Sequence, residues 1–162
     1  MLNIYAPVDL NGKSIYKQHV IPSTAELQQS LKPILGKKMK VKATKDIFVC
    51  LYGTHYLIPK GFVSDGASLP WFATILLDRF NPKILLFSIL HDLMYQSHIV
   101  PRFLADGIYE LGLEITSNKL TAKTFYTVLR PFGIIAWENN KKKGLYDYDE
   151  ARIRLLTHIC NK

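Results

Sequence analysis

Two apolar segments separated by a short break place the strongest constraint on what this chain can fold into. Pro82 can open a helix over residues 83–97, KILLFSILHDLMYQS, because the N–H that proline lacks is not needed in the first turn. The segment SHIVP at 97–101 ends that helix, and a second helical segment follows over 102–115. A short connection makes the two helices antiparallel neighbours, so the sequence predicts a helical hairpin.

Polar side chains recur on the inner face of this predicted hairpin. His91 and Asp106 lie at equal distances from the turn, and such residues of an antiparallel pair stand at similar heights. Tyr95 lies four residues after His91, and Tyr109 three after Asp106, so each shares the face of its neighbour. The spacing therefore predicts one polar cluster among the leucines of the hairpin.

A buried imidazole bonded to a carboxylate is an oriented general base, because the carboxylate fixes the tautomer and leaves the other ring nitrogen free to take a proton. We therefore take His91, Asp106 and Tyr95 as candidate catalytic residues. The alternative is structural. A histidine on an apolar helix face is often a structural residue of the core, and a nearby carboxylate then accepts its hydrogen bond.

Asp92 points about 100° away from His91 around the helix, toward a neighbouring loop. The loop VSDGAS supplies backbone carbonyls and Asp65, and such oxygens are the ligands of hard cations. Asp92 and Asp65 are therefore candidate metal ligands, with calcium as the candidate cofactor; the alternative is that Asp65 caps a turn. Ser64 and Ser68 lack the G-x-S-x-G elbow of a nucleophilic serine.

The segment before the hairpin has the composition of strands. Residues 39–59 alternate in places and are rich in Val, Ile, Phe and Tyr, with a hairpin turn expected at Gly53-Thr54. The stretch KGFVSDGASLPW, at 60–71, is dense in Gly, Ser and Asp and is typical of a structured loop. The fold class is therefore α+β, a small antiparallel sheet followed by a helical subdomain whose antiparallel pair carries the polar site.

The chain divides into three predicted parts, which are an N-terminal extension at 1–37, a core domain at 38–138 and a C-terminal loop and helix at 139–162. In the extension, Ser23 or Thr24 can cap a helix with apolar positions at Leu27, Leu31 and Ile34. A third core helix is expected over 121–137, kinked or broken near Pro131 and Gly133, and a last helix begins at Asp147 or Asp149.

Composition and charge limit the cellular compartments and the binding partners that we expect for this chain. The two cysteines are far apart and indicate no disulfide framework, and neither a signal peptide nor a transmembrane segment is expected. The net charge of +8 is compatible with anionic membrane lipid. Nothing is typical of a DNA-recognition module or an aromatic RNA-binding platform, so nucleic-acid binding would depend on charge alone.

The loop IPKGFVSDGASLPW, the helix LHDLMYQS and the helix RFLADGIYELGL, in this order, resemble the phage and prophage family catalogued as domain of unknown function 1353. The resemblance covers about residues 40–137. It implies a phage origin, often near virion or lysis genes, with no settled activity. The protein would then be found in the virion or the host cytoplasm.

A shorter resemblance concerns chemistry. HDLMY, followed by Ala-Asp on the next helix, is similar to the paired active-site helices of phospholipase A2. That similarity implies His91 as the base that activates water, Asp92 as a calcium ligand and Asp106 as the residue that orients His91, supported by Tyr95. The chain lacks the cysteines and the glycine-rich calcium loop of the secreted enzymes, so VSDGAS would have to replace that loop.

Two functions follow as hypotheses. The first is a virion-associated or lysis-related hydrolase of lipids or other esters, with anionic membrane lipid as its partner. The second is a virion component without enzymatic activity, in the tail or head–tail region, in which the N-terminal extension docks onto other virion proteins. In the second case the polar cluster contributes stability rather than rate.

Overall fold

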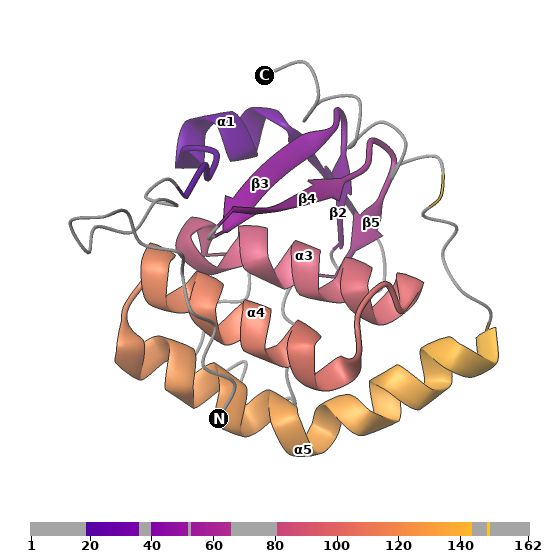
Figure 1. The fold of residues 1–162 in the computed structure, drawn as a ribbon. Helices are drawn as coiled ribbons and strands as arrows, with labels where there is room; N and C mark the ends of the chain where they lie inside the picture. The colour runs from indigo at the N-terminus through magenta and orange to yellow at the C-terminus, as the bar shows by residue number, and fades with distance from the viewer. Residues whose placement is uncertain (1–18, 36–39, 52, 66–80, 144–148, 150–162) are drawn as a thin grey trace.

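Short strands lie on one side of a layered arrangement of helices in the computed structural model (Figure 1). The structure describes residues 19–35, 40–51, 53–65, 81–143 and 149. Helix α3 packs against the strands and α1 on one side and against α4 on the other, and α4 in turn packs against α5. The strands precede these helices in the chain and pair antiparallel, so the predicted α+β class is confirmed.

Helix α1, Thr24–Gln29, begins with the predicted cap. The Ser23 hydroxyl accepts from the Glu26 backbone N–H, and the Glu26 side chain accepts from the Ser23 backbone N–H, which together form a capping box. The helix was expected to continue to Ile34, which is wrong. Pro33 would remove a hydrogen bond from a helix there, whereas it is tolerated in β1, Leu31–Ile34, at the edge of a sheet.

Two small sheets account for the strand-rich segment. The first has the order β1-β2-β5, with β2 at Lys40–Ala43 and β5 at Val63–Ser64. The second is the hairpin of β3, Ile47–Leu51, and β4, Thr54–Ile58. Its turn lies one residue earlier than predicted, because Thr54 already pairs with Leu51 and Gly53 takes the left-handed conformation at φ 77°.

Part of the segment predicted as an extension packs into the core. Leu27 of α1 belongs to the same buried cluster as the apolar residues of α3, and β1 pairs with β2. Residues 1–18 lie outside the described residues, so the docking arm stays a prediction. The predicted loop at 60–71 is a strand at Val63–Ser64, while residues 66–71 lie outside the described part of the chain.

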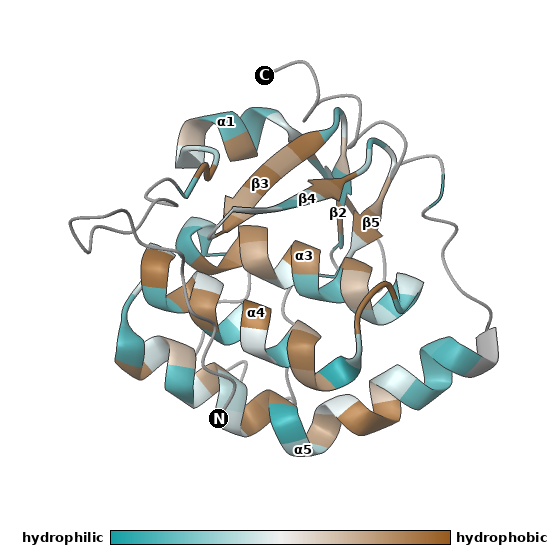
Figure 2. Cartoon of the chain, viewed as in Figure 1, coloured by the Kyte–Doolittle hydropathy of each residue, from teal (hydrophilic) through white to brown (hydrophobic). Residues whose placement is uncertain are grey.

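The predicted helical hairpin is present. Helix α3 spans Pro82–Ser97 with Asn81 as its N-cap, and it ends at His98, whose φ of 51° is left-handed. Helix α4 spans Arg102–Thr116. Apolar residues predominate on β3 and recur along α3 (Figure 2), and almost all of α3 from Ile84 to Tyr95 is buried between the strands and α4.

Helix α5, Lys119–Lys143, runs through Pro131 and extends beyond the predicted end at residue 137. It changes direction part-way along rather than breaking (Figure 1), which is what one missing backbone hydrogen bond produces when the rest of the helix is packed. The helix predicted from Asp147 or Asp149 lies almost wholly outside the described residues. None of the helices in the described ranges combines the length and apolar character needed to cross a bilayer.

Gly112 sets how closely α4 approaches α3. A Cβ at this position would overlap the ring of Phe87, which is fully buried. We expect Gly112→Ala to lower the free energy of unfolding by about 1–3 kcal/mol, because the core must shift to accept the methyl group. Gly107 lies on the same helix with open space around its Cβ position, so Gly107→Ala is the matched control and should be neutral or stabilising by up to about 1 kcal/mol. Urea denaturation measures both variants, and equal effects would contradict this packing.

Candidate active site

The predicted partners His91 and Asp106 meet across the α3–α4 interface. Nε2 of His91 lies 3.0 Å from Oδ1 of Asp106, and both side chains are buried. The lowered pKa of Asp106 keeps the carboxylate ionised, so the ring nitrogen is the donor and the proton belongs on Nε2. Nδ1 of His91 has no hydrogen-bond partner among the described residues, and the side chain keeps a 10% exposed fraction.

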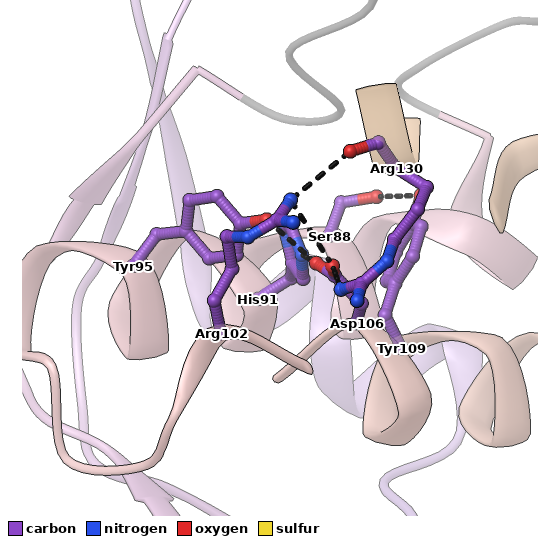
Figure 3. Close-up of polar contacts among 7 residues, drawn as sticks. All are labelled: Ser88, His91, Tyr95, Arg102, Asp106, Tyr109 and Arg130. Atoms are coloured by element: carbon purple, nitrogen blue, oxygen red, sulfur yellow. Dashed lines mark hydrogen bonds and ion pairs between the residues drawn. The ribbon is translucent and has the colours of Figure 1, made fainter. Parts of the chain in front are cut away.

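Asp106 receives donors on both of its oxygens (Figure 3). The Tyr95 hydroxyl donates to Oδ1 at 2.6 Å, beside the bond from His91. Arg130, on α5, donates from Nη1 to Oδ2 at 2.6 Å, and Arg102 forms an ion pair with the same oxygen at 3.7 Å. Asp106 is 2% exposed, and side chains from three helices contact its two oxygens.

These contacts decide the protonation of the cluster. Burial acts to raise the pKa of Asp106, but the hydrogen bonds from His91, Tyr95 and Arg130 outweigh it and hold the pKa below its ordinary value. Burial and the neighbouring carboxylate raise the pKa of Tyr95, so its hydroxyl stays protonated and remains a donor. The result is a charged acceptor surrounded by fixed donors.

Two tyrosine rings fix the plane of the imidazole. The centroids of the His91 and Tyr95 rings lie 4.2 Å apart, and those of His91 and Tyr109 lie 4.9 Å apart. Ser88 donates to the carbonyl of Ile84, so the Tyr109 hydroxyl, 3.2 Å from Ser88 Oγ, is the donor of that pair. Tyr109 is thereby anchored to α3 and supports the position of His91.

The C-terminal half of α5 packs against the end of α3, and this packing holds Arg130 close to Asp106. The Trp137 indole stacks on the His98 ring at 4.0 Å, and Asn140 donates to the backbone carbonyl of Tyr95. Gly133 permits this approach, since a Cβ there would lie 2.6 Å from the Tyr95 hydroxyl.

The predicted metal ligands form a second polar group on the side of α3 that faces β5. Asp92 Oδ2 accepts from the Ser64 hydroxyl at 2.5 Å. Burial raises the pKa of Asp92 well above its ordinary value, and the negative charge of Asp65 alongside raises it further. Among the described residues, no third His, Cys, Asp or Glu joins these two carboxylates.

The structure thus brings together the residues that the helical spacing grouped, in two sets. His91, Tyr95 and Asp106 are in mutual contact, and Asp92 lies beside Asp65. Their catalytic and metal-binding roles stay predictions. Sequence reasoning missed Arg130, whose distance of 24 residues from Asp106 gives no local signal; a single arginine among apolar residues in TVLRPFG was the available indication.

A family model described as "Protein of unknown function (DUF1353)" matches residues 41–129, more than half of the chain. The chain belongs to this family. The DUF1353 match runs from β2 into α5 and includes both polar groups, whereas Arg130 lies one residue beyond its end. No curated protein and no solved structure matches the chain.

The two buried aspartates predict opposite effects of pH on this DUF1353 protein. The raised pKa of Asp92 means that its ionisation opposes folding. Asp92 therefore lowers the free energy of unfolding by an amount that grows as the pH rises above about 4, the ordinary carboxyl pKa. With a chelator present, Asp92→Asn should therefore raise the melting temperature at pH 7, by about 2–4 °C for each kcal/mol regained, with a smaller gain at pH 4.

Asp106→Asn is the matched control with the opposite sign. The folded pKa of Asp106 is lowered, so this carboxylate stabilises the wild-type protein fully above about pH 4, and the stabilisation is lost as the pH falls further. The Asn variant should therefore melt below wild type at pH 7. Thermal melts from pH 3 to pH 7 test both. A lower melting temperature for Asp92→Asn at pH 7 would contradict the assignment of an unfavourable charge to Asp92.

Proposed function

We propose that the chain is a bacteriophage-encoded hydrolase of lipids or other carboxylic esters, with His91 as its general base. The observation that carries the proposal is the orientation of His91. Its Nε2 is bonded to an ionised, buried Asp106, while Nδ1 has no partner among the described residues. This is the arrangement of an imidazole prepared to take a proton.

In the proposed reaction, His91 Nδ1 takes a proton from a water molecule as the water oxygen attacks the ester carbonyl carbon. The resulting tetrahedral intermediate expels the alkoxide, which receives the proton from His91, so the products are an acid and an alcohol. Asp106 remains ionised and stabilises the imidazolium formed between these steps. Tyr95 keeps the Asp106 carboxylate in register with the ring.

Asp92 and Asp65 are the residues that would hold a calcium ion. They fit a hard cation, because burial and the charge of Asp65 raise the pKa of Asp92, and a divalent ion bound by both carboxylates would offset the repulsion that opposes its ionisation. The Ser64 hydroxyl, already bonded to Asp92, is a further oxygen at this place. Bound there, the ion would supply positive charge for the oxyanion.

A second candidate function is a structural component of a virion, of the tail or head–tail region. It is favoured by the number of donors on Asp106, since a carboxylate engaged by His91, Tyr95 and two arginines also serves to fasten three helices together. A fully satisfied buried network of this kind specifies a unique packing. Residues 1–18, which would dock onto other virion proteins, lie outside the described residues.

Ester hydrolysis by the His91 variant separates the two functions. We expect wild type to release fatty acid from liposomes or short-chain esters when calcium is present. His91→Gln should lower kcat by at least about 100-fold, since a general base contributes about 10²–10⁴. The glutamine amide can still donate to Asp106, so the melting temperature should change little, and His19→Gln, an exposed histidine, is the matched control.

The contrary result is also specific. If wild type hydrolyses no ester with any divalent cation, and His91→Gln chiefly lowers the melting temperature, the proposed hydrolase is rejected and the structural role is supported.

A further inference from the structure

Arg102 and Arg130 share a single carboxylate oxygen. Their Nη1 atoms lie 3.7 Å and 2.6 Å from Oδ2 of Asp106, and Nη1 of Arg102 also donates to the backbone carbonyl of Arg130 at 3.0 Å. Within the described residues, Asp106 is the acid that pairs with either arginine. One carboxylate neutralises one guanidinium, so this pair keeps an excess positive charge.

The pair also has more hydrogen-bond donors than its contacts with the described residues use. Each guanidinium has five N–H donors in a planar fork, whereas the contacts with Asp106 and with the Arg130 carbonyl use the Nη1 atoms, and Arg102 has the Tyr95 hydroxyl as one further neighbour. The side chains of Arg102 and Arg130 are 21% and 36% exposed. Figure 3 shows the two groups meeting at Asp106, one from the start of α4 and the other from α5.

The start of α4 adds to the positive potential. Arg102 is the first residue of this 15-residue helix, its N-cap is Pro101 without a side-chain cap, and the first turn holds no acidic residue. The partial positive charge of the helix N-terminus therefore adds to that of the arginines. Asp106, one turn further on, is already engaged by three hydrogen-bond donors and by the ion pair with Arg102.

We infer that Arg102 and Arg130 form a binding site for a phosphate group. Guanidinium forks match the oxygens of a phosphate in pairs, and a charge of −1 or −2 offsets the excess charge of the pair. Both arginines contact Oδ2 of Asp106 while His91 contacts Oδ1, so the phosphate would lie beside the proposed general base. That it is the phosphate of an ester substrate depends on the proposed function; the binding does not.

The test is a titration of the full-length protein with inorganic phosphate at constant ionic strength, followed through the arginine Nε–H resonances. Wild type should show a saturable shift at Arg102 and Arg130. Arg102→Gln should bind at least about tenfold more weakly, because a charge-assisted pair is lost, and Arg102→Lys should lie between them. Lys123→Gln removes the same charge from an exposed position on α5 and should bind like wild type.

A second titration with a soluble short-chain phosphatidyl ester identifies the source of the phosphate. Tighter binding of the ester at the same resonances assigns the site to a substrate headgroup, and binding of inorganic phosphate alone assigns it to the free ion. Absence of a saturable shift in wild type, or equal affinity in Arg102→Gln, overturns the inference.

The outcomes of the two proposals are separable. Phosphate binding without hydrolysis of any ester would reject the hydrolase and keep this site, whereas hydrolysis without phosphate binding would do the reverse.

Discussion

The Asp106 carboxylate is the interaction on which the arrangement of the helices depends. Its Oδ1 accepts from His91 and Tyr95 of α3, and its Oδ2 faces Arg102 of α4 and Arg130 of α5. A buried charge is costly unless it is paired and hydrogen-bonded, so each donor is needed and each constrains the helix that supplies it. The separation of its two oxygens also separates two tasks, since Oδ1 orients the imidazole and Oδ2 holds the positive charges.

The two aspartates of the α3 region lie in opposite electrostatic environments. Asp106 is surrounded by donors that lower its pKa, whereas Asp92 is buried beside another acid and its pKa is raised. A protein that needed stability alone would gain from a neutral residue at Asp92. In the proposed function this difference suits two roles, an ionised carboxylate that orients His91 at Asp106 and a cation ligand at Asp92.

Much of this arrangement was predictable because it is local. The positions of Pro82 and Pro101 predict the hairpin, and the 15-residue separation of His91 and Asp106 across it predicts their contact. The failures have a different cause. The helix predicted as far as Ile34 ends at Gln29 because Pro33 disfavours a helix there and pairing with β2, which lies outside that segment, favours β1. Arg130 was missed for the same reason, since the packing of α5 rather than a sequence pattern brings it to Asp106.

Asp106 fixes His91 with its proton on Nε2 and leaves Nδ1 to accept another. The tautomer is measured directly by long-range ¹H–¹⁵N NMR of the labelled histidine ring, at a pH where the imidazole is neutral. We expect a protonated Nε2 and an unprotonated Nδ1 for His91, with this preference lost in Asp106→Asn. A proton on Nδ1 in wild type, or the same tautomer in both proteins, would contradict it.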